Sequence, residues 1–281
     1  MTMNDFSKIR LIALDMDGTA MNSQSVITAY AKSVIKQISE KYLLVPATGR
    51  GAYNLVEDHI EAENIRYIIA ANGALVVDRH ENKNIFNFVI PYDIASSIIA
   101  ESCYPEGMVY IHCNDEICSH IFHCQQRNVF DQKYANRIRC NENNKYDEEL
   151  ASHILANKMD VLKIGIKCSN QEETERCKTN IITKYPEVNV FDTDMNALEI
   201  TNKNASKGTS LERLCQYLGI KQDEVCAIGD NGNDASMLKW AGIGVAMENA
   251  VEQTKNIADM IIGTNDEDGA AKFLEAYLMV R

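Results

Sequence analysis

Short apolar runs alternate with polar turns and amphipathic stretches along this chain, and this alternation restricts its fold more than any other feature. Apolar runs over 9–14, 42–47 and 67–70 each end in a polar turn that contains glycine. After the first run, apolar residues from Ser25 to Ile38 follow helical spacing, with Ser25 as the predicted N-cap. A second helix is expected after the second run. Strand, turn and helix in this order predict an α/β fold with a doubly wound parallel sheet.

The pattern changes in the middle of the chain, where pairs of strands joined by polar turns alternate with helices, one of them over roughly 124–136. Strand, turn and helix resume near Glu187, with strands predicted at 188–192 and 197–200. Hairpins mixed with helices are typical of an α+β domain rather than of further parallel units. The sequence therefore predicts a Rossmann-like core domain interrupted by an inserted α+β domain, with the core formed by 1–81 and 189–281 and the insert by 82–188.

Charge and composition exclude several classes of protein. The chain has 28 Lys and Arg against 40 Asp and Glu, a net charge of −12, so phosphate-rich nucleic acids and anionic membranes would be repelled. No apolar run reaches the ~18 residues of a membrane-spanning helix, and the N-terminal stretch lacks the uninterrupted apolar segment of a signal peptide. The nine cysteines are an odd number and are interpreted as reduced thiols, so a cytoplasmic location is expected.

Four polar loops lie at the ends of predicted strands or the starts of predicted helices. They are DMDGT at 15–19, ATGR at 47–50, SKG at 206–208 and GDNGND at 229–234. In open α/β sheets the functional crevice lies outside the carboxyl ends of the strands. Closely spaced carboxylates suit a hard cation such as Mg²⁺, and a hydroxyl with backbone N–H groups at a helix start can hold an anion. Each loop alone also fits an ordinary solvated turn, so the argument depends on their joint occurrence.

In this order, the strings LDMDGT, ATGR, ANGA, ASKG, IGDNGND, GVAMENA and DEDGAA resemble phosphatases of the haloacid dehalogenase superfamily. More narrowly, they are similar to the Cof-type branch, which carries a type-2 α/β cap where this chain has its predicted insert. The resemblance implies a Mg²⁺-dependent phosphatase that hydrolyses small phosphorylated metabolites through an aspartyl-phosphate, with the cap carrying the specificity. Sugar phosphates, or phosphorylated cofactors such as FMN or pyridoxal phosphate, are the implied substrates.

The resemblance also implies a role for individual residues. Asp15 matches the nucleophile and Asp17 the general acid/base, and both match metal ligands together with Asp230. Thr19 and Asp234 match residues that do not bind the metal themselves but orient the residues that do. The positions that match phosphate or substrate binding are Met16, Thr48, Gly49, Arg50, Asn72, Lys207 and Asn233.

Alternatives from other classes stay open at this point. A phosphomutase would return the phosphate to its substrate, and a ligand-binding regulator would keep the fold without useful turnover.

Seven of the nine cysteines lie in the predicted insert, but the His- and Cys-rich segment 112–124 lacks the ligand spacing of a zinc finger, so buried thiols are expected. Glu248 stands where the family often has glycine, and we expect it to affect loop shape or substrate fit. The sequence says nothing about the oligomeric state.

Overall fold

The computed structural model describes residues 5–52, 64–102, 108–113, 120–124, 145–146, 149–193 and 196–279. The chain divides into two compact units, one made of Met1–Asn87 with Ser206–Arg281 and the other of Phe88–Ala205. The helices predicted after Arg50 and over roughly 124–136 fall on residues outside this description. No helix in the described part of the chain is both long and apolar enough to cross a membrane.

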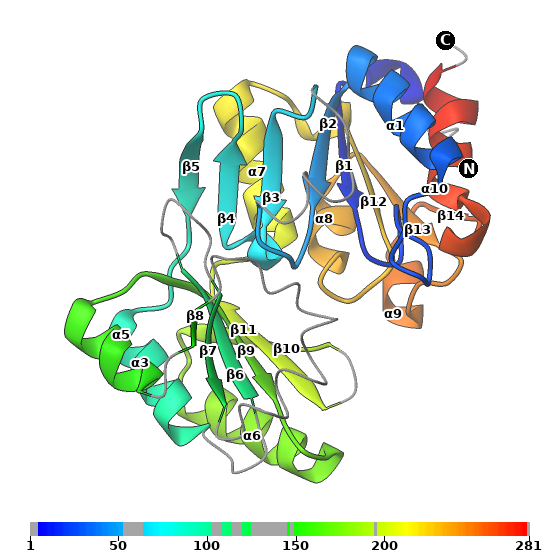
Figure 1. The fold of residues 1–281 in the computed structure, drawn as a ribbon. Coiled ribbons are helices and arrows are strands. Elements are labelled where there is room, and N and C mark those ends of the chain that lie inside the picture. Colours follow the sequence, from blue (N-terminus) through cyan, green and yellow to red (C-terminus); the bar gives the residue numbers. More distant parts are fainter. Residues whose placement is uncertain are drawn as a thin grey trace. The chain divides into compact units, whose positions relative to one another are not determined.

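The first unit is built on an eight-stranded sheet in the order β14-β13-β12-β1-β2-β3-β4-β5 (Figure 1). All neighbouring strands are parallel except β3–β4 and β4–β5, which are antiparallel. The strands are β1 Leu11–Asp15, β2 Leu43–Ala47, β3 Tyr67–Ala70, β4 Leu75–Asp78, β5 Lys83–Asn87, β12 Val225–Gly229, β13 Ile243–Met247 and β14 Met260–Ile262. The predicted parallel α/β core is confirmed.

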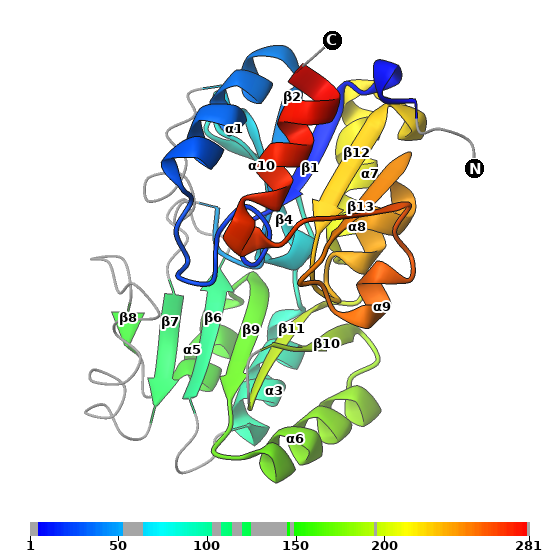
Figure 2. The same cartoon turned by 90° about the vertical axis from the view of Figure 1, so that its right-hand side faces the viewer.

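Helices cover both faces of this sheet. The connection from β1 to β2 runs one way along the sheet and that from β12 to β13 runs the other way, so right-handed crossovers place their helices on opposite faces. Accordingly, α1 and α10 lie on one face and α7 and α8 on the other (Figure 1 and Figure 2). The helices are α1 Ala29–Lys41, α7 Lys207–Leu218, α8 Ala235–Trp240, α9 Glu252–Lys255 and α10 Gly269–Leu274. Because both faces are covered, β1 and β12 are buried along their whole length.

The start of α1 differs from the prediction. Ser25 has a left-handed backbone (φ +58), whereas an N-cap residue adopts an extended one. The helix begins after Thr28, whose Oγ1 accepts a hydrogen bond from the backbone N–H of Ala31 at 3.0 Å. The prediction that Ser25 caps this helix is therefore wrong. The predicted start of α7 is confirmed, with Ser206 as its N-cap.

The second unit is an α+β domain, as predicted for the insert. Its six-stranded sheet has the order β10-β11-β9-β6-β7-β8, with antiparallel neighbours except for β7 and β8. Side chains from the three helices described in this unit and from one face of β6, β9, β10 and β11 form a hydrophobic cluster. The elements are β6 Met108–Cys113, β7 His120–Cys124, β8 Lys145–Tyr146, β9 Val161–Lys167, β10 Val188–Asp192, β11 Ala197–Asn202, α3 Tyr92–Glu101, α5 Leu150–Asn157 and α6 Gln171–Lys184.

The residues at which the chain passes from one unit to the other differ from the predicted domain boundaries. β10 and β11, which the sequence assigns to the core from residue 189 onward, pair antiparallel with each other and with β9, so they belong to the second sheet. β5, assigned to the insert from residue 82 onward, pairs antiparallel with β4 in the first sheet. The chain therefore changes unit at 87/88 and at 205/206, because strand pairing and not apolar pattern decides membership of a sheet.

Candidate active site

Neighbouring strands bring acidic and phosphate-binding candidates to one edge of the eight-stranded sheet. β1 ends at Asp15, and β12 ends at Gly229, one residue before Asp230. β1 pairs in parallel with β12 on one side and with β2 on the other, where Asp15 lies opposite Ala47, the residue before Thr48. Three of the four predicted loops therefore leave the sheet at the same edge.

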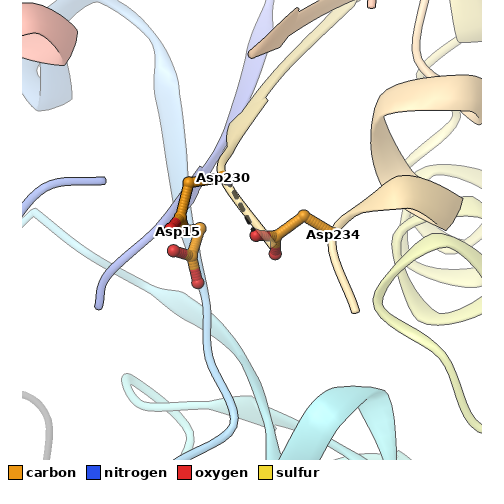
Figure 3. Close-up of side chains that lie close together, drawn as sticks. All are labelled: Asp15, Asp230 and Asp234. Carbon is orange, nitrogen blue, oxygen red and sulfur yellow. Dashed lines mark hydrogen bonds between the residues drawn. The ribbon is translucent and has the colours of Figure 1, made fainter. Parts of the chain in front are cut away.

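Three carboxylates converge there. Asp15, Asp230 and Asp234 each offer one oxygen, and these atoms lie within 4.8 Å of one another. Figure 3 shows Asp15 beside Asp230, and its dashed line marks the hydrogen bond that the backbone N–H of Asp230 donates to the Asp234 carboxylate. Burial, with the negative charge of Asp234, raises the pKa of Asp15 well above its ordinary value and raises the pKa of Asp230 to about 6. Without a bound cation the cluster therefore tends to retain protons.

The ammonium group of Lys207 offsets part of this negative charge. Its Nζ donates to Oδ1 of Asp15 at 2.6 Å and to Oδ1 of Asp234 at 2.5 Å. Lys207 is the first residue of α7 and is 1% exposed. Burial alone would lower the pKa of this ammonium, but the charges of Asp15 and Asp234 raise it instead, so Lys207 stays protonated.

Asp234 organises the loop around it. Its Oδ2 accepts hydrogen bonds from the backbone N–H groups of Asp230 and Asn231, each at 3.0 Å. Its Oδ1 accepts from Lys207, and the residue is fully buried. Both oxygens are thus engaged within the protein, which fits the predicted supporting role of Asp234 rather than that of a ligand.

Gly18 and Thr19 lie against Asp230. The hydroxyl of Thr19 donates to Oδ1 of Asp230 at 3.2 Å. Gly18 has φ +80, and a Cβ at this position would lie 2.4 Å from Oδ2 of Asp230, so both its backbone and the space around it require glycine. The DMDGT turn thereby fixes the position of the Asp230 carboxylate.

One oxygen of the cluster lacks a partner. Oδ2 of Asp15 is buried, and no hydrogen-bond donor reaches it among the residues that the structure describes. A buried acceptor without a donor costs free energy. An unpartnered carboxylate oxygen beside a second carboxylate is the donor set that Mg²⁺ prefers, so Asp15 and Asp230 fit a hard cation.

Asp17 is held outside this cluster by Arg50. The Arg50 guanidinium donates from Nε to Oδ2 of Asp17 at 2.8 Å and from a terminal nitrogen to Oδ1. The Asp17 side chain is 50% exposed, in contrast to buried Asp15. The two carboxylates of the DMD string therefore lie in different environments, one buried and one at the surface, as different chemical roles would require.

Three further predicted residues lie within the first two loops and are buried or half-buried. Thr48 is fully buried, and its Oγ1 accepts a hydrogen bond from the backbone N–H of Arg50 at 3.0 Å, while Gly49 is half-buried. Met16 is fully buried, and its carbonyl accepts from the N–H of Met21 at 2.8 Å. These contacts hold the backbones of the first two loops in fixed positions.

Asn72 and Asn233, predicted from separate strings, lie in contact. Nδ2 of Asn233 donates to Oδ1 of Asn72 at 3.0 Å, and Asn72 is 2% exposed. Asn249 is a residue that the sequence reasoning missed: its Nδ2 donates to the carbonyl of Gly18 at 2.8 Å. The sequence does contain a signal for it, since Asn249 belongs to the GVAMENA string, next to Glu248, which is exposed.

Comparisons with known proteins find relatives that match nearly the whole chain. A phosphatase of Bacillus subtilis is 27% identical over 286 residues, which cover 96% of this chain and 100% of that protein. A 5-amino-6-(5-phospho-D-ribitylamino)uracil phosphatase of the same organism is 25% identical over 285 residues, covering 96% of this chain and 98% of that protein.

Solved structures and a family model extend the comparison. The crystal structure of a haloacid dehalogenase-like hydrolase from Bacteroides thetaiotaomicron matches with a TM-score of 0.78 and 27% identity, covering 95% of this chain and 99% of that one. The family model of haloacid dehalogenase-like hydrolases matches residues 12–274, nearly the whole chain. This chain therefore belongs to the haloacid dehalogenase-like hydrolases and is an enzyme of that family.

Proposed function

We propose that this enzyme is a Mg²⁺-dependent phosphatase that acts on small phosphorylated metabolites through an aspartyl-phosphate on Asp15. The observation that carries the proposal is the state of the Asp15 carboxylate, which is buried and held by Lys207 at Oδ1, while no donor among the described residues reaches its Oδ2. In phosphoryl transfer the protein contributes mainly by positioning the nucleophile and by neutralising the charge of the phosphoryl group. Asp15 with Lys207 meets both requirements.

The side chains of Asp15 and Asp230, with the backbone carbonyl of Asp17, would hold the Mg²⁺. The buried Oδ2 of Asp15 and its neighbour Asp230 support this assignment, while Asp234 would keep the loop in place. When bound, the cation would withdraw charge from the phosphoryl oxygens as a Lewis acid.

Two displacements on phosphorus complete the reaction. First, a carboxylate oxygen of Asp15 forms a bond to phosphorus, the bond from phosphorus to the leaving oxygen breaks, and Asp17 gives its proton to that oxygen. Asp17 then takes a proton from water, whose oxygen attacks phosphorus and frees both inorganic phosphate and the Asp15 carboxylate. Lys207 offsets the charge of the phosphoryl group throughout, and Met16, Thr48, Gly49, Arg50 and Asn233 would surround it.

The substrates that we propose are sugar phosphates or phosphorylated cofactors such as FMN or pyridoxal phosphate. Support comes from the relative of Bacillus subtilis whose name specifies a phosphorylated ribityl compound. The unit Phe88–Ala205 would act as the cap that selects among such compounds.

A screen for phosphate release across these classes, with Mg²⁺ present, tests the proposal. We expect orthophosphate from at least one class and its loss in Asp15→Asn, whereas Asp223→Asn, which changes a 63% exposed carboxylate, should retain activity. Isomerisation of a hexose 1-phosphate without free phosphate would instead identify a phosphomutase. A protein that folds but is inert across the whole panel would favour the ligand-binding regulator.

A further inference from the structure

A left-handed turn follows β3 at the edge where the acidic cluster lies. Ala71, Asn72 and Gly73 are consecutive and have φ values of +50, +56 and +90. Left-handed backbone is unfavourable for residues other than glycine, and asparagine tolerates it best among the others. Such strain persists only where surrounding contacts maintain it, and it is concentrated at functional sites.

The backbone of this turn joins two of the predicted phosphate-binding loops. The N–H of Asn72 donates to the carbonyl of Thr48 at 3.0 Å, so the turn lies against the ATGR loop. On its other side, Gly73 touches the start of α7, where a Cβ on this glycine would lie 2.2 Å from the carbonyl oxygen of Ser206. Ser206 directly precedes Lys207, so the turn also lies against the loop that carries the buried ammonium.

The side chain of Asn72 contacts a third loop. Its Oδ1 accepts the hydrogen bond from Nδ2 of Asn233 at 3.0 Å. The other end of the Asn233 amide, Oδ1, is buried and has no hydrogen-bond partner in the part of the chain that the structure describes. The contact at Nδ2 therefore determines how this amide is oriented.

We infer that Asn72 is a positioning residue, which orients the Asn233 amide so that its second Nδ2 hydrogen donates to the phosphoryl group. An amide has one donor end and one acceptor end, and only the donor end attracts an anion. Since Nδ2 carries two hydrogens, Asn72 can engage one of them and leave the other for a phosphoryl oxygen. This assignment rests on the proposed function, and it moves Asn72 from direct substrate contact to a place behind Asn233.

A double-mutant cycle on the full chain tests the assignment. The variants are Asn72→Gly, which removes the amide and suits a left-handed backbone, Asn233→Ala, and both together. The matched control is Asn82→Gly, an exposed left-handed asparagine (φ +48) between β4 and β5. The measurements are kcat and KM for p-nitrophenyl phosphate, the inhibition constant of inorganic phosphate, and the melting temperature.

The expected result is coupling between the two asparagines. Asn72→Gly and Asn233→Ala should each raise the inhibition constant of phosphate about tenfold, the effect of one lost hydrogen bond to a charged group, and the double variant should lose no more than Asn233→Ala alone. Asn82→Gly should match the unchanged protein. Independent, multiplying losses, or an Asn72→Gly variant with an unchanged inhibition constant, would overturn the inference.

Two further arms separate the possible failures. If Asn72→Gly does not melt cooperatively, Asn72→Asp replaces it, because aspartate keeps an acceptor and tolerates the same backbone. In the Asn72→Asp background, Asn233→Ala should still raise the inhibition constant of phosphate by the same factor as in the unchanged protein. If Asn233→Ala has no effect on the inhibition constant in that background, the inference is overturned. If the unchanged protein hydrolyses no phosphate ester, the proposed function fails, and the cycle is then read on inorganic phosphate binding by calorimetry alone.

Discussion

Replacement of Lys207 by methionine, which is of similar length but uncharged, measures how far the acidic cluster depends on its ammonium. At an effective dielectric constant of about 20, two unit charges at the observed 2.6 Å attract by about 6 kcal/mol. Desolvation of the buried ions offsets several kcal/mol of this, and removal of one partner from a buried pair costs about 3–5 kcal/mol. We expect a loss of about 3 kcal/mol at pH 7, at the low end because the stranded carboxylates can take up protons.

Urea unfolding in the presence of EDTA provides the assay. Trp240, the single tryptophan of the chain, lies in α8 of the same unit and reports on its unfolding by fluorescence. Lys8→Met is the matched control, because Lys8 pairs with Asp223 at 4.0 Å with both side chains more than half exposed, and such pairs contribute little. Its unfolding curve should overlay that of the unchanged protein.

The dependence on pH makes this prediction sharper. Burial and the charge of Asp234 already raise the pKa of Asp15, and loss of Lys207 raises it further. A protonated carboxyl needs no counter-charge, so the cost of Lys207→Met should shrink as the pH falls from 7 to 5. An unchanged urea midpoint at pH 7, or a cost that grows on acidification, would refute the electrostatic reasoning.

Three other outcomes are expected from the same site. EDTA should stop hydrolysis and added Mg²⁺ should restore it; turnover that survives exhaustive chelation contradicts the metal assignment. Because the pKa of Asp230 is raised to about 6, protons compete with the cation below that pH, so calorimetry should show Mg²⁺ affinity falling and proton release rising on acidification. Gly18→Ala should lower both the melting temperature and the Mg²⁺ affinity, since its Cβ would lie 2.4 Å from Asp230; normal Mg²⁺ affinity would disprove this.

The predicted loops lie close together in the structure because the order and direction of the strands alone determine at which edge of the sheet each loop lies. An apolar run such as β1 is recognisable from sequence, and parallel pairing carries the residue after each strand to the same edge. Asp15, Thr48 and Asp230 therefore required no side-chain detail to be placed near one another. The N-cap of α7 was equally accessible, since Ser206 shows the local preference of a capping hydroxyl.

The boundaries between the units were not accessible in this way. An alternating apolar pattern marks a strand but not its partner, so β10 and β11 look the same whether they join a parallel core or an antiparallel insert. The error over Ser25 has a similar origin, because Thr28 offers the same hydroxyl and only the backbone angles distinguish the two. Contacts between distant side chains, such as that from Asn72 to Asn233, left no trace in the sequence pattern.

The charge of the acidic cluster connects its stability to its chemistry. Three ionised carboxylates and one ammonium sum to −2, the charge that one divalent cation cancels. In the absence of a cation, burial and the charge of Asp234 raise the pKa values of Asp15 and Asp230, which favours proton uptake as part of the compensation. A protonated Asp15 is a poor nucleophile, so the same cation that would balance the buried charge would also keep Asp15 ionised. Metal binding, proton release and activation of the nucleophile would then be a single linked equilibrium.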